Sequence, residues 1–264
     1  MSGPERLRTA FFGRAFVPIS AQGLETALAQ PGIEVVSVTC GRGEAASWQD
    51  GPLNEVAHAA GITLLAFQEV RQCFPQLDLS ISFSNPIVFP PSFLTSVSLG
   101  VVNMHPAPLP AYRGCHGIEH AIINGDDRFG ATLHYCAPEI DTGPTIEVLW
   151  TSIDSHDVAT DIWHRIDDLA LELLRRNLPR IVEAGQRGER LPAIPQDSER
   201  SGYYDHFSLP DEAELDLCRP WEENVRWVRA YQHPRRRPAY IFSQDRRISL
   251  RYEGGRVYLE KVEP

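Results

Sequence analysis

Apolar positions in the first 105 residues form short, nearly continuous blocks, separated by segments with helical spacing. The blocks contain many β-branched residues, which is typical of buried strands. They predict strands over 8–13, 34–40, 62–67, 77–83 and 100–105, helices over 21–30 and 53–61, and a helical turn at 90–96. Strands that alternate with helices across short connections favour an α/β fold with a mainly parallel sheet.

The pattern changes after residue 114. A short helix is expected over 117–125, and segments 130–136 and 145–153 alternate apolar with polar positions as half-buried strands do. Residues 157–185 have the spacing of a long amphipathic helix. We therefore expect one catalytic domain over residues 1–185, a size that is ordinary for a single domain.

The remaining residues predict a smaller unit. Residues 186–220 are polar and rich in proline and read as a linker, and 222–232 has the spacing of a helix. ISLRYEGGRVYLEKV (248–262) reads as a hairpin around Gly254 and Gly255. We expect residues 186–264 to form a linker and a small C-terminal subdomain. A hairpin alone is marginal in water, so its apolar face needs a cover. We expect a homodimer to supply part of it, and a monomer that folds back on its own helix is the alternative.

Composition excludes several classes of function. The net charge of −10 disfavours nucleic acid as a partner, because that affinity comes from clustered cations. The chain has a single lysine, Lys261, which argues against a Schiff-base lysine and a phosphate-binding GK[ST] loop. Five scattered cysteines without a CxxC pair suggest neither a zinc cluster nor a disulfide framework. No membrane span and no signal-peptide core are evident, so we expect a cytoplasmic protein.

The segment VVNMHPAPLPAYRG (101–114) carries the candidate chemistry. Asn103 and His105 lie two residues apart at the end of a predicted strand, so their side chains can share one pocket. Ligands bind beyond the carboxyl ends of such strands, and three prolines then restrict the loop that follows. Asp141 lies in EIDTGPTIE, on a predicted loop that leads into a strand.

These three side chains suit acyl transfer. An Asn amide can donate to an oxygen that gains negative charge in a tetrahedral intermediate. A His can accept the proton that an attacking amine loses, and an Asp beside it can orient the ring. Cys115 is nearby, but nothing in the sequence marks it as a nucleophile.

The segments NMHPAPLPAYRG, AIINGDDRFGATLHY and IDTGP resemble the transferases that use 10-formyltetrahydrofolate. The resemblance covers roughly residues 8–185, and it implies a Rossmann-like formyltransferase core with a mainly parallel sheet plus a small C-terminal helix and β-hairpin appendage. Asn103, His105 and Asp141 match the catalytic trio. The HPAPLP variant and the length look most like the sugar-nucleotide N-formyltransferases.

The resemblance also implies binding residues, and the absence of a ligand cluster from the sequence predicts no metal. The pterin pocket, formed largely by backbone groups, would include Ser84, Asn85, Pro86, Ile87, Val88, Tyr135 and Ile140. The amine substrate would contact Pro106, Arg113, Gly114, His116 and Tyr203. One departure is Cys136-Ala137-Pro138-Glu139, where the family has a small, acidic, glycine-containing loop; the spacing to Asp141 is kept.

Several residues have a plainer interpretation. We expect His134 to be a strand residue that faces a neighbour, and His116 and His120 to lack the third ligand that a metal site needs. The run Arg235-Arg236-Arg237 suits a diphosphate or a carboxylate, and a solvated loop equally well.

The functional expectation is formyl transfer to the amine of a nucleotide-linked amino sugar. Formylation of an amino-acid or hydroxamate-precursor amine, a folate hydrolase and a non-catalytic folate-binding protein are the alternatives.

Overall fold

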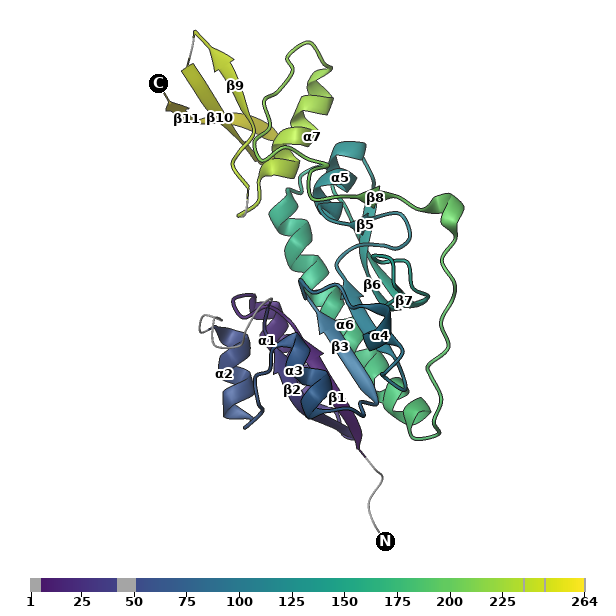
Figure 1. Ribbon diagram of the computed structural model, residues 1–264. Coiled ribbons are helices and arrows are strands. Elements are labelled where there is room, and N and C mark those ends of the chain that lie inside the picture. The colour runs from purple at the N-terminus through teal and green to yellow at the C-terminus, as the bar shows by residue number, and fades with distance from the viewer. Residues whose placement is uncertain (1–5, 42–50, 235, 245, 264) are drawn as a thin grey trace.

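A six-stranded sheet forms the main body of the computed structural model, which describes residues 6–41, 51–234, 236–244 and 246–263 (Figure 1). The strands are β1 (Leu7–Phe12), β2 (Ile33–Thr39), β3 (Leu79–Phe83), β4 (Val101–His105), β6 (Arg128–Tyr135) and β7 (Thr145–Ser152). Their spatial order is β2-β1-β3-β4-β6-β7. Neighbours from β2 to β4 pair in parallel, and β6 runs antiparallel to both β4 and β7. The mainly parallel sheet is confirmed.

Helices cover both faces of this sheet. One face packs against α1 (Pro18–Ala29) and the long α6 (Ala159–Gly185), with α2 (Pro52–Ala59) and α5 (Gly117–Asn124) beside them. The other face carries α3 (Phe67–Cys73) and α4 (Pro91–Leu94). Successive strand residues point to opposite faces. Phe11 therefore packs in the cluster with Leu24 of α1, and Phe12 packs in the cluster with Phe93 of α4.

The strand predicted over 62–67 is wrong. Only one isolated bridge, between Val38 and Leu64, joins this segment to β2 in the described part of the chain. Glu69 accepts a hydrogen bond from the backbone of Ala66 at 2.7 Å and thereby caps a helix that begins at Phe67. A short apolar run does not distinguish a strand from a buried loop that leads into a helix.

The C-terminal part holds α7 (Trp221–Tyr231) and a three-stranded antiparallel sheet, drawn at the top of Figure 1. The predicted hairpin is present as β10 (Arg246–Glu253) and β11 (Arg256–Glu263). A third strand, β9 (Tyr240–Ser243), pairs with β10 and was not predicted. Leu250 and Tyr252 of β10 are buried in the same cluster as Val228 of α7, so the cover of the hairpin comes in part from its own helix.

Residues 186–204, here called the strap, connect the two parts. The strap leaves α6 and runs up the outer side of the molecule to β8 (Tyr203–Tyr204), which pairs with β5 (Arg113–Gly114) (Figure 1). Midway, Ile194 forms a bridge to Thr145, with two backbone hydrogen bonds of 2.8 Å. The strap therefore lies along the edge of the sheet near residues 135–145.

No helix in the described ranges has a stretch long and apolar enough to cross a membrane.

Phe12 provides a test of the second core cluster. Its ring is fully buried and lies 4.9 Å and 5.7 Å from the rings of Phe89 and Phe93, measured between centroids. Removing a buried ring leaves a cavity that the neighbours fill only partly, so Phe12→Ala should lower the free energy of unfolding by about 3–5 kcal/mol. Phe16→Ala, which removes a ring that is 54% exposed, should change it by less than about 0.5 kcal/mol. Urea unfolding of both variants measures the difference; equal losses would contradict this packing.

Candidate active site

The structure brings Asn103, His105 and Asp141 together at the carboxyl end of β4. Nδ1 of His105 lies 3.5 Å from Oδ2 of Asp141. Asn103 enters the same cluster through His134, which contacts its amide and whose Nε2 lies 3.7 Å from Oδ1 of Asp141. The four side chains come from two neighbouring strands, β4 and β6, and from the loop that follows β6 (residues 136–144).

A chain of hydrogen bonds fixes the amide of Asn103. Its Oδ1 accepts a bond of 2.7 Å from the hydroxyl of Ser82, on the neighbouring strand β3. Its Nδ2 donates to Nε2 of His134 at 3.0 Å, across the pairing of β4 with β6. Among the described residues the second N–H of this amide has no hydrogen-bond partner, so it remains free to bind a ligand.

His134 holds the tautomer that this arrangement requires. Its Nδ1 lies 2.8 Å from the backbone carbonyl of Tyr135, which can only accept, so Nδ1 carries the proton and Nε2 accepts from Asn103. Burial lowers the pKa of His134 from 6.5 to about 4, although the carboxylate of Asp141 acts in the opposite direction. The ring is therefore neutral near pH 7 and acts as an acceptor for Asn103.

The proline loop orients His105. Nε2 of His105 donates to the backbone carbonyl of Tyr112 at 2.7 Å. The loop that brings this carbonyl back to β4 is itself held by Thr132, whose hydroxyl accepts from Leu109 N–H at 3.0 Å and donates to the carbonyl of Ala107 at 2.8 Å. The other ring nitrogen, Nδ1, faces the carboxylate of Asp141. An imidazole that takes up a proton here thus meets an acceptor at each nitrogen.

Asp141 lies in a constrained backbone conformation. Its φ of 55° is in the left-handed region, which is uncommon for a residue with a side chain. Its Oδ2 accepts a hydrogen bond of 2.9 Å from the backbone N–H of Gly114 in β5. Behind it, Gly143 packs directly on the carbonyl of Tyr135, where a Cβ atom would clash with that oxygen. The loop therefore presents the carboxylate between His105 and His134.

No thiol in the cluster is poised as a nucleophile. Cys115 is exposed beside Gly114, and partial burial and the charge of Asp141 raise the pKa of its thiol. A raised pKa keeps sulfur in the protonated, weakly nucleophilic form.

Five of the residues predicted to line the pterin pocket, 84–88, follow β3 directly, and the other two lie at the end of β6 and in the loop after it. Ser84, with φ 55°, begins a turn in which Asn85 bonds to the backbone N–H and carbonyl of Ile87 and donates to Ser82 at 3.3 Å. Pro86 is half-buried, and Val88 and Ile140 are exposed. The side chain of Tyr135 is buried away from the cluster and donates to the carbonyl of Leu191, so only its backbone lies at the site.

The residues predicted to contact the amine substrate are more dispersed. Pro106 is exposed, Gly114 binds Asp141, and the ring of Tyr203 is 59% exposed. The guanidinium of Arg113 donates to Gln196 of the strap at 3.0 Å and 2.8 Å.

His116 lies farther from the trio. One ring nitrogen accepts from Arg236 at 2.8 Å, and the other faces the carbonyl of His206 at 3.2 Å. His120 contacts Ser208. Within the described ranges, no three His, Cys, Asp or Glu side chains are grouped as metal ligands.

The arginine run at 235–237 pairs with carboxylates of the same chain, as far as it is described. Arg236 forms a buried ion pair of 2.9 Å with Glu119, and Arg237 pairs with Glu212. Arg235 lies outside the described residues.

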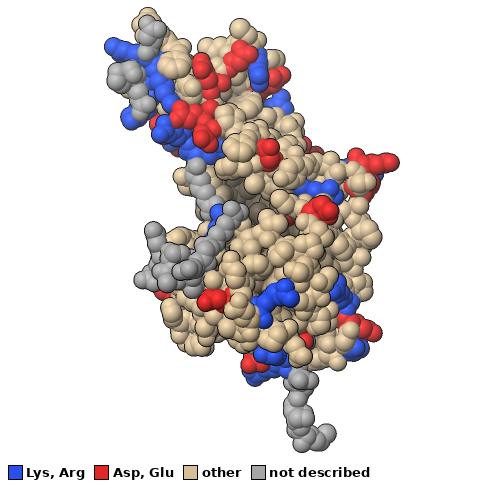
Figure 2. Space-filling model, viewed as in Figure 1, with Lys and Arg blue, Asp and Glu red and all other residues tan. Residues whose placement is uncertain are grey.

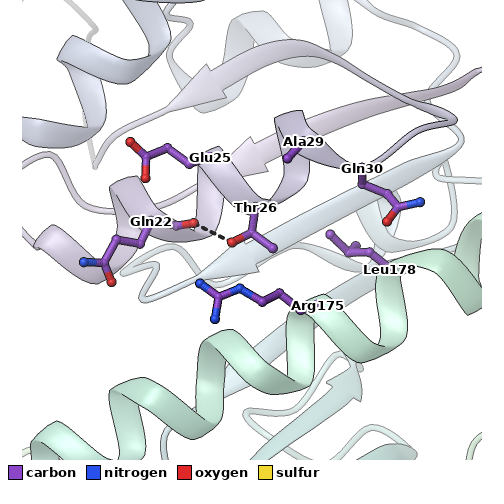
Figure 3. Close-up of a pocket in the computed structure, with 7 residues that line it drawn as sticks. All are labelled: Gln22, Glu25, Thr26, Ala29, Gln30, Arg175 and Leu178. Atoms are coloured by element: carbon purple, nitrogen blue, oxygen red, sulfur yellow. Dashed lines mark hydrogen bonds between the residues drawn. The ribbon is translucent and has the colours of Figure 1, made fainter.

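A hollow of about 650 Å³ between α1 and α6 shares no residue with this cluster (Figure 3). Its wall combines long polar side chains with Leu178 and Ala29, and Thr26 bonds there to the backbone of Gln22. It holds neither a histidine nor a cysteine. The candidate chemistry therefore lies at the end of β4 and not in this hollow.

Sequence reasoning missed three residues of this cluster. His134 was predicted to be a plain strand residue, yet it contacts Asn103 and faces Asp141. The pairing of β6 with β4 would have revealed it, because residues opposite each other in a sheet point to the same side. Ser82 follows from the same argument on β3. Gln196 carries no local signal.

The neutral ring of His134 predicts a pH effect on stability. The folded pKa lies below the ordinary value, so between pH 6.5 and 4 the unfolded chain binds a proton that the folded chain does not. The stability that the neutral His134 ring allows is fully present above pH 6.5, and it is lost as the pH falls toward 4. A change from pH 7.5 to pH 5 should lower the free energy of unfolding by on the order of 2 kcal/mol because of this residue. Urea unfolding at both pH values should show a smaller loss of stability for His134→Gln than for the wild type. An equal loss in both proteins would contradict a buried, neutral His134.

Comparison with known proteins agrees with this geometry. Residues 68–178 match the family model described as formyl transferase. The chain is 30% identical over 209 residues to a methionyl-tRNA formyltransferase of Synechocystis, covering 75% of this chain and 61% of that protein. A second such enzyme, from Pediococcus pentosaceus, is 29% identical over 143 residues, covering 54% and 43%. The chain thus spans about half the length of the curated relatives it matches.

Solved structures share the fold at lower identity. A 4-N formyltransferase from Francisella tularensis superposes with a TM-score of 0.75 and 20% identity, covering 96% of this chain and 98% of that one. An N-formyltransferase from Helicobacter canadensis, in complex with folinic acid and dTDP-3-aminofucose, gives 0.72 and 18%, covering 92% and 88%. The matched segment, residues 68–178, contains Asn103, His105, His134 and Asp141, and these findings confirm the predicted resemblance to the formyl transferases.

Proposed function

We propose that this protein transfers a formyl group from 10-formyltetrahydrofolate to the primary amine of a nucleotide-linked amino sugar. The observation that carries the proposal is the amide of Asn103, fixed between Ser82 and His134 with one N–H free, beside the pair His105–Asp141. Asn103, His105 and Asp141 are assigned as the catalytic residues. Residues 1–185 would be the catalytic domain, and 186–264 the linker and C-terminal subdomain.

In the proposed reaction the amine attacks the formyl carbon of the donor. A C–N bond forms, and the carbonyl oxygen becomes an oxyanion. The free N–H of Asn103 donates to that oxygen, and its fixed orientation avoids reorganisation as the charge develops. Collapse of the intermediate breaks the bond from the formyl carbon to N10 of the folate, which leaves tetrahydrofolate and the formamide.

Proton transfer falls to His105 and Asp141. The attacking nitrogen loses one proton, and the departing N10 gains one, so the reaction is balanced without a metal or an external reductant. Nδ1 of His105 and Oδ2 of Asp141 face each other across 3.5 Å and offer adjacent acceptors for that proton. The carbonyl of Tyr112 holds the proton of Nε2 on the opposite side of the ring, which leaves Nδ1 as the ring nitrogen that can accept.

The donor would bind along residues 84–88 and the loop before Asp141. The turn at Asn85 joins this segment to Ser82 and through it to Asn103. Residues 135–140 would contribute backbone groups, and Ile140 would add an exposed aliphatic side chain. Ser84, Asn85, Pro86, Ile87, Val88, Tyr135 and Ile140 are the proposed folate contacts.

The C-terminal subdomain favours a small amine over a tRNA. Four of its basic side chains are paired with carboxylates: Arg236 with Glu119, Arg237 and Arg247 with Glu212, and Arg251 with Glu253. Figure 2 shows acidic and basic side chains intermixed over this part of the visible face. An RNA-binding surface needs clustered, unpaired cations. The names of the curated relatives make methionyl-tRNA the second candidate acceptor, which the assay below includes.

The direct test is a panel of acceptors incubated with protein and donor. Nucleotide-linked amino sugars, amino acids, hydroxamate-precursor amines and methionyl-tRNA are compared by mass for the gain of one formyl group. A formylated sugar nucleotide is the expected product. Donor turnover without any amine would identify a folate hydrolase, and formylation of methionyl-tRNA alone would refute the proposed acceptor.

The proposed trio predicts large losses of activity. Asn103→Ala, His105→Ala and Asp141→Ala should each lower kcat/KM for formyl transfer at least about a hundredfold, because each removes charge stabilisation or proton transfer in the transition state. Steady-state kinetics measure the loss, and circular dichroism checks the fold. His164→Ala, an exposed change on α6, is the control and should retain activity. Near-normal rates in two of the three variants would exclude the assignment.

We also propose a homodimer that covers the outer strand of the C-terminal sheet. β11 lies at one edge, and Leu259 on it is 66% exposed while Tyr258 and Val262 are also exposed. Light scattering at micromolar concentration should give twice the chain mass of 29.6 kDa. Leu259→Lys should shift the mass toward the monomer, whereas Leu28→Lys on α1 should not. A wild-type mass of one chain would reject the dimer.

A further inference from the structure

One side chain of the strap, that of Gln196, contacts the backbone of the loop that carries Asp141. Gln196 is half-buried, and its Nε2 donates to the backbone carbonyl of Asp141 at 2.8 Å and to that of Gly143 at 2.7 Å. These two carbonyls flank Thr142, so a single amide group holds both sides of the turn that carries Asp141. The contact spans 55 residues of chain.

Arg113 determines which way this amide faces. Its Nε and Nη2 donate to Oε1 of Gln196 at 3.0 Å and 2.8 Å. A guanidinium has donors only, so the oxygen of the amide must face Arg113 and the NH₂ group must face the loop. Both N–H bonds of Gln196 are therefore committed to the two loop carbonyls.

The strap also reaches the carboxylate of Asp141 through β5. β5 and β8 pair along Arg113 and Gly114, with hydrogen bonds from Arg113 N–H to Gly202 at 3.0 Å and from Cys115 N–H to Tyr204 at 2.8 Å. Gly114 lies between these bonds and donates to Oδ2 of Asp141. The backbone and the carboxylate of Asp141 are thus held by neighbouring parts of one assembly.

Asp141 needs such support. A residue with a side chain is strained at φ near 55°, and this conformation persists only where its surroundings fix it. Relaxation of this turn would move the carboxylate relative to His105. A displacement of about 1 Å at a reacting group can lower a rate about a hundredfold.

We infer that Gln196, oriented by Arg113, is a positioning residue that holds the carboxylate of Asp141 at its working distance from His105. This inference rests on the formyl transfer proposed above. It gives Arg113 a role behind the site, through Gln196, in place of the direct substrate contact expected from the resemblance. It also assigns the strap a part in catalysis that is separate from substrate recognition.

The test uses the full chain and two substitutions at one position. Gln196→Met keeps the length of the side chain and removes every hydrogen bond. Gln196→Glu keeps the acceptor for Arg113 and removes both donors to the loop. Each should lower kcat by about 10- to 100-fold and change KM for donor and amine by less than about threefold, because the lost contact acts on the reacting groups. Arg200→Met, an exposed change on the same strap, is the matched control and should stay within about twofold of the wild type.

A double-mutant cycle separates this role from general packing. If Arg113 acts through Gln196, Arg113→Met combined with Gln196→Met should lower kcat no further than the stronger single change. Multiplicative losses would show that Arg113 acts independently of Gln196 and would overturn the inference. So would a kcat for both Gln196 variants within threefold of the wild type. If Gln196→Met fails to fold, Gln196→Glu carries the test, since it keeps the bond to Arg113.

A measurement without turnover distinguishes this inference from the proposed function. The imidazole NMR signals of His105 should move in Gln196→Glu, because Asp141 shifts beside that ring, while those of exposed His164 should stay. Unchanged His105 signals would overturn the positioning role even if the wild type formylates. A shift of the His105 signals in a protein that formylates no amine would support the positioning role and reject the proposed function.

Discussion

The amide of Asn103 is the group on which the site depends, and a single directed chain of hydrogen bonds orients it. The backbone N–H of Ile87 donates to Asn85, Asn85 donates to Ser82, Ser82 donates to Asn103, and Asn103 donates to His134. The chain ends where Nδ1 of His134 donates to a carbonyl that can only accept. Each link fixes the direction of the next, so the donor face of Asn103 is determined by the fold.

This series of hydrogen bonds requires the antiparallel strand β6 beside β4. A parallel sheet that continued past β4 would place another strand end there and would offer no imidazole opposite Asn103. The reversal brings His134 into register with Asn103 and carries the chain from β6 into the loop of Asp141. Burial then keeps the His134 ring neutral, as an acceptor must be. The change of strand direction and the tautomer of His134 thus both orient the amide of Asn103.

Local patterns were sufficient for the parts of this arrangement that are local. The spacing of Asn103 and His105 on one strand follows from strand geometry. The apolar blocks predicted β1 to β4, and the alternating segments predicted β6 and β7, with 62–67 as the one strand too many. Contacts between distant segments were not predictable in this way. Ser82 and His134 required the order of the strands, and Gln196 required the path of a polar segment that has no periodicity. β9 follows a proline-rich stretch and is too short to give a clear pattern.

The backbone around Asp141 has a consequence for redesign of the acceptor site. Gly143, Gly114 and Gly202 each press against a main-chain carbonyl, of Tyr135, Tyr204 and Ala111 respectively, where any Cβ atom would clash. None of the three supplies a reacting group. Together they form a line of close backbone contacts, here called the seam, that has no space for a side chain. A library aimed at a new amine should therefore diversify exposed positions such as Tyr203 and Phe207 and keep the seam intact. In this protein, tolerance to substitution therefore follows how closely two backbones approach.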